Sequence, residues 1–99
     1  MTQKYQLSLE HSLLPIRKQI DELDAQLLNW LEKRIILIKE VGEIKKKYSA
    51  PVLSKSREDS ILMKVRNEAV LRGIPELLVL DIWNAIFKAA YELEENHDR

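Results

Sequence analysis

A single apolar stripe, from Leu13 to Ile44, constrains the fold of this chain more than any other feature of its sequence. Its apolar residues recur at three- and four-residue steps, which is typical of an amphipathic helix. They are Ile16, Ile20, Leu23, Leu27, Trp30, Leu31, Ile38 and Val41. Ser12 is a good N-cap, Pro15 is tolerated in a first helical turn, and no breaker follows until Ser49-Ala50-Pro51. The stripe therefore predicts one long helix between these two signals.

Such a helix is too long for its own chain to enclose. At 1.5 Å per residue, residues 13–48 would span about 54 Å, whereas a compact domain of this size has a radius of gyration of about 13 Å. We expect a second copy, lying antiparallel along the helix, to bury the rest of the stripe in an interlocked homodimer. Gly42 costs about 1 kcal/mol in the middle of a helix and indicates a close helix crossing.

The remaining sequence predicts two shorter helices. Residues 49–54 form a loop, and Ser54 or Ser56 caps the second helix. Gly73 ends that helix, and a third runs from Pro75 to about Asn96. With two glycines and three prolines among 99 residues, the composition also favours an all-α protein. We expect one domain over residues 1–99, frayed at 1–11 and 96–99.

Charge and composition exclude several classes of function. Sixteen basic and sixteen acidic residues cancel, so no global field favours nucleic acid or an anionic membrane. The chain has no cysteine for a disulfide, a thiol nucleophile or a Cys-based metal site. His11 and His97 have no ligand partners at metal-binding spacing, so no metal is predicted. Residues 1–12 lack a signal-peptide core and no 18-residue apolar run occurs, so a soluble cytoplasmic protein is expected.

Two cations lie on the apolar stripe itself. Arg34 and Lys45 are eleven residues apart, so on a straight helix their side-chain directions differ by about 20° and their Cα atoms lie about 16 Å apart. Because charges are rarely buried without a partner, this pair suggests a small anionic ligand between helices. Arg17 is rotated by about 100° from Arg34 and would more easily reach a partner subunit's site. The alternative interpretation makes all three of them solvated cations.

Two acidic residues have structural explanations when each is considered alone. Glu58 stands in the first turn of the second helix, where a carboxylate is favourable whatever the function. Glu94 follows Ala90 by one turn on the third helix and, viewed alone, belongs to the polar C-terminal tail. Neither residue identifies a site by itself.

Taken together, IRKQIDELDAQLLNWLEKRIILIKEVGEIKK, then PV, then SREDSIL resemble the all-helical (type II) chorismate mutases. The likeness covers nearly the whole chain. Its elements are IRxxID-x-LD, a mid-helix Arg, VGxxK, a PV loop and an RE pair, which are far more specific in combination than singly. The resemblance implies a three-helix protomer interlocked in a dimer with shared active sites, and neither a metal nor a cofactor.

The resemblance also implies a role for each site residue. Three arginines would surround the two substrate carboxylates: Arg34, Arg57 and Arg17 of the partner subunit. Lys45 would bond a carboxylate and the ether oxygen of the breaking bond, while Glu58 would accept from the ring hydroxyl. Ser54 stands where Asp is common, although that contact is expected from the backbone. Ala90 replaces a serine that helps to hold the ring carboxylate.

Glu94 replaces a glutamine that donates to the ether oxygen, and the fungal enzymes are similar in having Glu there. A glutamate can donate only when it is protonated, so turnover is expected to fall as Glu94 loses its proton.

The implied reaction is the pericyclic conversion of chorismate to prephenate in phenylalanine and tyrosine biosynthesis. Isochorismate pyruvate-lyase and 4-amino-4-deoxychorismate mutase are alternatives, and a non-catalytic helical dimerisation or regulatory module is a third. Because the family includes fusions with prephenate dehydratase or dehydrogenase, both a free-standing enzyme and a fragment remain open.

Overall fold

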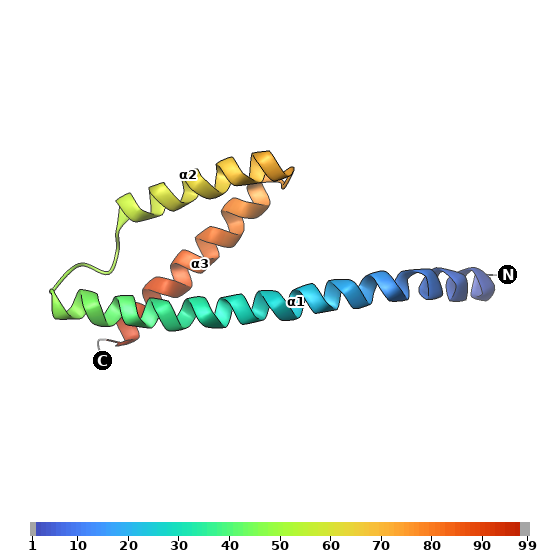
Figure 1. Ribbon diagram of the computed structural model, residues 1–99, viewed down its shortest axis with the longest axis horizontal. Helices are drawn as coiled ribbons and strands as arrows, with labels where there is room; N and C mark the ends of the chain where they lie inside the picture. Colours follow the sequence, from blue (N-terminus) through green and yellow to red (C-terminus); the bar gives the residue numbers. More distant parts are fainter. Residues whose placement is uncertain (1, 98–99) are drawn as a thin grey trace. The chain divides into compact units, whose positions relative to one another are not determined.

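The computed structural model describes residues 2–97, apart from the side chains at positions 2, 4, 96 and 97. Within this range the chain forms three α-helices and no strand: α1 (Thr2–Lys47), α2 (Lys55–Arg72) and α3 (Glu76–His97) (Figure 1). The all-α prediction and the order of one long and two shorter helices are therefore confirmed. The fraying predicted for 96–99 falls partly on residues 98 and 99, which lie outside the described range.

The start of α1 differs from the prediction. We expected a helix beginning near Ser12 with Pro15 in its first turn, but α1 begins at Thr2 and contains Pro15 in its interior. Proline there removes one i→i−4 hydrogen bond and crowds the carbonyl of residue 11, at a cost of about 3 kcal/mol. The Gln, Lys, Leu and Glu residues that precede it favour helix, so the helix continues across the missing bond.

The described chain divides into two compact units, Met1–Arg34 and Ile35–Arg99. In the first, the apolar stripe stays exposed: the accessible fractions of Ile20, Leu23, Leu27 and Trp30 are 49%, 62%, 57% and 65%. Exposed apolar residues singly are ordinary, but a row of them along one helix marks an interaction surface. This part of the stripe is therefore not covered by the chain's own residues.

The second unit contains the end of α1 together with α2 and α3. Ser54 caps α2, as expected: its side chain accepts from the backbone N–H of Arg57 at 3.3 Å. Gly73 ends α2 with φ 67° and ψ 28°, and its N–H returns to the carbonyls of Ala69 and Val70. A left-handed residue at this place is commonly glycine, because a Cβ would be strained there. The tight turn after Gly73 leads directly into α3 (Figure 1).

The core of the second unit lies between α2 and α3, which pack against each other. The buried apolar residues are Ala69 on α2 and Val79, Phe87 and Ala90 on α3. One charged residue, Glu94, is buried with them at 2% exposure. None of the three described helices is both long enough and apolar enough to cross a bilayer.

Candidate functional site

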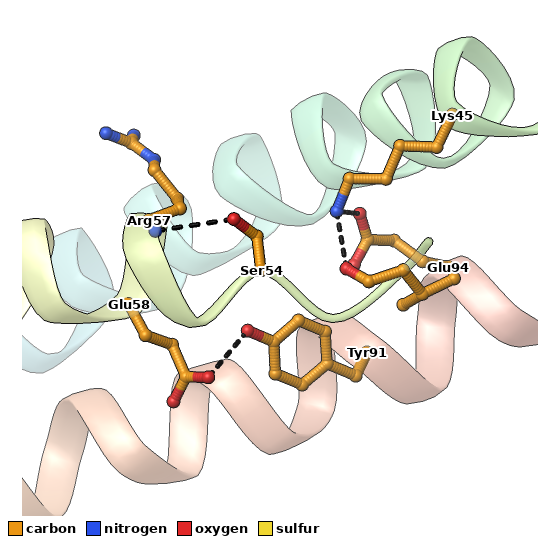
Figure 2. Close-up of polar contacts among 7 residues, drawn as sticks. Lys45, Ser54, Arg57, Glu58, Tyr91 and Glu94 are labelled. Atoms are coloured by element: carbon orange, nitrogen blue, oxygen red, sulfur yellow. Dashed lines mark hydrogen bonds and ion pairs between the residues drawn. The ribbon is translucent and has the colours of Figure 1, made fainter. Parts of the chain in front are cut away.

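Lys45, in the last turn of α1, reaches two acceptors on other segments (Figure 2). Its Nζ donates to the carbonyl oxygen of Val52 at 2.6 Å and lies 2.9 Å from Oε1 of Glu94. The Lys45 side chain is 23% exposed and that of Glu94 only 3%. An ammonium group has three protons, so these two contacts leave one N–H for a ligand. The arrangement holds a cationic donor in a fixed position with access to solvent.

Gly42 explains how α3 comes close enough to Lys45. A Cβ added at Gly42 would lie 3.3 Å from Cα and 3.4 Å from Cγ of Glu94, inside the usual separation of carbon atoms. Lys45 follows Gly42 by three residues and therefore faces the same side of α1. The close helix crossing predicted from Gly42 is confirmed, and it places Glu94 against the ammonium group.

The burial of Glu94 corrects one interpretation of the sequence. Considered alone, Glu94 was assigned to the polar tail, but the structure buries it. Burying a carboxyl group is costly unless it is paired and hydrogen-bonded. Lys45 supplies that partner from 49 residues earlier in the chain (94 − 45), which is a distance that helical periodicity does not bridge.

The first turn of α2 contributes Arg57 and Glu58. The Ser54 cap sets the start of this turn, so that Glu58 is half-buried while Arg57 is exposed. In Figure 2 the Arg57 side chain extends away from Glu58 and Tyr91. A single helix start therefore presents a cation and a carboxylate on different sides.

Tyr91 is a site residue that the sequence interpretation missed. Its hydroxyl donates to Oε2 of Glu58 at 2.9 Å, which links α3 to α2 (Figure 2). Burial, followed by the hydrogen bond and the negative charge of Glu58, raises the pKa of the Tyr91 phenol above 10.0. A hydrogen bond from the backbone of Ser54 acts in the opposite direction. The available signal was its spacing, because Tyr91 precedes Glu94 by three residues on α3.

Six of the expected site residues belong to the second unit: Lys45, Ser54, Arg57, Glu58, Ala90 and Glu94. Arg17 and Arg34 belong to the first unit. There Arg17 pairs with Glu10 at 2.6 Å, with side chains 55% and 61% exposed, and Arg34 is half-buried. An ion pair this exposed contributes little to stability, so the Arg17 guanidinium can exchange partners readily.

The cluster formed by Lys45, Arg57, Glu58, Tyr91 and Glu94 offers charge and hydrogen bonds rather than a nucleophile or a metal centre. Among the described residues no three His, Asp or Glu side chains gather where they could hold a metal ion. Lys45 can donate to an anion or to an oxygen that gains negative charge, and Glu58 can accept from a hydroxyl. This arrangement suits a small, anionic, hydroxylated ligand that is held and polarised.

Comparison with known proteins gives a consistent assignment. The family model of chorismate mutase type II matches residues 16–95. The chain is 38% identical over 84 residues to the T-protein of Enterobacter agglomerans, an alignment that covers 85% of this chain and 22% of that protein. It is 35% identical over 86 residues to the bifunctional chorismate mutase/prephenate dehydratase of Aquifex aeolicus, covering 84% and 24%. It is 28% identical over 85 residues to the chorismate mutase of Methanocaldococcus jannaschii, covering 86% of each.

The chain thus spans less than a quarter of the first two of these relatives. No solved structure matches it significantly.

Proposed function

Because the chain belongs to the chorismate mutase type II family, we propose that it converts chorismate to prephenate, a step towards phenylalanine and tyrosine. The observation that carries the proposal is the buried contact of Lys45 with Glu94 at 2.9 Å. This contact puts the Lys45 ammonium, a permanent donor, beside the Glu94 carboxyl group, and these are the two groups that the family resemblance assigns to the ether oxygen.

The proposed reaction breaks one C–O bond and forms one C–C bond within the same molecule. Electrons move in a closed ring, so no protein atom is bonded covalently and no cofactor is needed. Catalysis then comes from holding the flexible enolpyruvyl arm in a reactive pose, and from donors aimed at the ether oxygen as it gains negative charge. The fixed ammonium group of Lys45 fits the second requirement because its position is set before the substrate arrives.

Glu94 is the second proposed donor to the ether oxygen. Its Oε1 faces Lys45, which leaves the other carboxyl oxygen for the substrate. Only the protonated form has an O–H to donate. This proposed role therefore requires a proton on Glu94 in the substrate complex, whereas in the free chain Glu94 forms an ion pair with Lys45.

The proposed substrate contacts divide by charge. Arg34, Arg57 and Arg17 of the partner subunit hold the two carboxylates, and the remaining N–H of Lys45 is shared between one of them and the ether oxygen. Glu58 accepts from the ring hydroxyl beside the backbone of Ser54. Ala90 is 8% exposed and has no polar side-chain atom, so the ring carboxylate has one contact fewer than a serine there would supply.

We further propose an interlocked homodimer in which a second copy covers the apolar stripe of residues 13–34. The stripe is long and exposed, as Ile16 at 54% and Leu27 at 57% illustrate. Arg17 lies on the same helix and is held only by an exposed ion pair with Glu10, so its guanidinium is free to bind the substrate in the partner's site. The cytoplasmic location expected from the sequence remains a prediction.

Product identification tests the proposed function and separates it from its alternatives. The purified chain is incubated with chorismate, isochorismate and 4-amino-4-deoxychorismate in turn, with Lys45→Ala as the control. Prephenate from chorismate, absent with the control, is the expected result. Salicylate and pyruvate from isochorismate alone would indicate a lyase instead. No turnover of any of the three would favour a non-catalytic dimerisation or regulatory module, which the apolar Ala90 would suit.

A further inference from the structure

The Tyr91 hydroxyl occupies a specific place in the cluster. It donates to Oε2 of Glu58 at 2.9 Å and has the backbone of Ser54 as a hydrogen-bond partner. These are the two groups that the proposed function places around the ring hydroxyl of the substrate. Tyr91 therefore lies at the hydroxyl end of the site.

We propose that Tyr91 is a positioning residue for hydroxyl recognition, which fixes the Glu58 carboxylate so that its Oε1 faces the ring hydroxyl of the substrate. This inference rests on the proposed function and adds a residue to it. A carboxylate has two oxygens and can accept several hydrogen bonds at once. Tyr91 uses one oxygen, and the substrate hydroxyl uses the other.

The placement of Tyr91 supports this role. Without a partner, a half-buried glutamate in a first helical turn samples several rotamers, and ordering it on binding costs free energy. The phenol bond spans 33 residues of sequence and joins α3 to α2, so it ties the carboxylate to a second element. Tyr91 also stays a neutral donor at neutral pH, because burial and Glu58 both oppose loss of its proton.

The position of Tyr91 on α3 connects the two ends of the site. Residues three apart on a helix project from the same face, about 5–6 Å apart at Cβ. Tyr91 and Glu94 are such a pair, so one face of α3 orders Glu58 at the hydroxyl end and presents a carboxyl group to Lys45. A substrate that lacks a hydroxyl at this position would gain nothing from the ordered Glu58.

The test is steady-state kinetics of Tyr91→Phe with chorismate, with Tyr48→Phe as the matched control. Tyr48 is 73% exposed, and its replacement removes a phenol hydroxyl outside the cluster. A hydrogen bond to a charged group is strong enough that losing it should raise KM about three- to tenfold. The value of kcat should change less than about twofold, because the ring hydroxyl is not one of the reacting atoms.

The same substitution made in the Glu58→Ala variant tests whether the change in KM depends on Glu58. In Glu58→Ala the carboxylate is gone, so adding Tyr91→Phe should change KM by less than about twofold. A KM for Tyr91→Phe that equals the wild-type value, or falls below it, overturns the inference; a lower value would mean that the phenol obstructs the substrate. A full effect that persists in Glu58→Ala overturns it as well. Failure of the proposed function is distinguishable, because it appears as absent turnover in the wild-type chain, and it removes this inference too.

Discussion

Removal of the Lys45 ammonium group should lower both the free energy of unfolding and the activity, and the two losses have different physical causes. Lys45→Met keeps most of the side-chain volume but deletes the charge and all three donors. It leaves Glu94 at 3% side-chain exposure without its cation, and the carbonyl of Val52 without its donor. The variant therefore perturbs the fold and the proposed chemistry at once, and a second substitution is needed to separate the two effects.

The stability loss follows from the geometry of the pair. Breaking a buried ion pair by removing one partner costs about 3–5 kcal/mol. Because 23% of the Lys45 side chain remains exposed, water can reach the gap, and we expect the lower end, about 3 kcal/mol. The double variant Lys45→Met/Glu94→Gln contains no unpaired charge and should recover most of this loss, since neutral replacements of buried pairs are well tolerated.

The kinetic loss has a different origin and should not recover. One well-placed donor to an oxyanion is worth about 3–4 kcal/mol of transition-state stabilisation, which is roughly a factor of 10²–10³ in kcat/KM. Glutamine at position 94 can still donate to the ether oxygen but cannot replace the cation. The double variant should therefore be nearly as stable as wild type and still about 10²-fold slower.

Urea unfolding gives the stabilities, and loss of chorismate absorbance gives kcat/KM. Glu94→Gln alone serves as the matched control, because it retains Lys45. A stable double variant with kcat/KM within a factor of about ten of wild type would remove Lys45 from the mechanism. A Lys45→Met variant as stable as wild type would show that the buried pair makes no net contribution.

The remaining predictions concern subunit sharing and helix approach. An equal mixture of Arg17→Ala and Lys45→Ala chains, exchanged under mild denaturation, should regain about a quarter of wild-type activity, since half of the dimers carry one intact site. Activity no higher than that of the separate inactive variants would rule out sharing of Arg17. Gly42→Ala should lose about 1 kcal/mol of stability and some kcat, because the added methyl crowds Glu94 at 3.3 Å by more than its helix propensity compensates; higher stability with unchanged kcat would refute it.

Local signals in the sequence predicted their structures well. Ser54 was predicted as one of two caps and is the N-cap of α2, and Gly73 was predicted as a stop and adopts the left-handed conformation. Each depends on backbone groups within a few residues, so the residue type nearly determines the outcome. Pro15 shows the limit of such signals, because one lost hydrogen bond did not outweigh the helix-forming residues before it.

The site was accessible from the sequence only in part. Periodicity placed Arg34 and Lys45 on one face, and the family resemblance added Glu58 and Glu94 with their roles. Helical phase gives the direction of a side chain on its own helix, but not which residue of another helix it will meet. Tyr91 was missed for this reason, since its partner Glu58 lies 33 residues earlier.

The sequence by itself determined that this chain forms three helices, that the second begins at Ser54 and ends at Gly73, and that the first presents an apolar face that a lone chain cannot cover. The tertiary structure decided that Glu94 is buried against Lys45 and that Tyr91 holds Glu58. The physical reason is the range of the interactions involved. Hydrogen bonds within a turn depend on neighbouring residues, whereas the burial and pairing of a charge depend on how closely two helices approach. Gly42 depends on both, because the sequence shows that it has no side chain and only the fold shows that this absence lets α3 approach the Lys45 ammonium group.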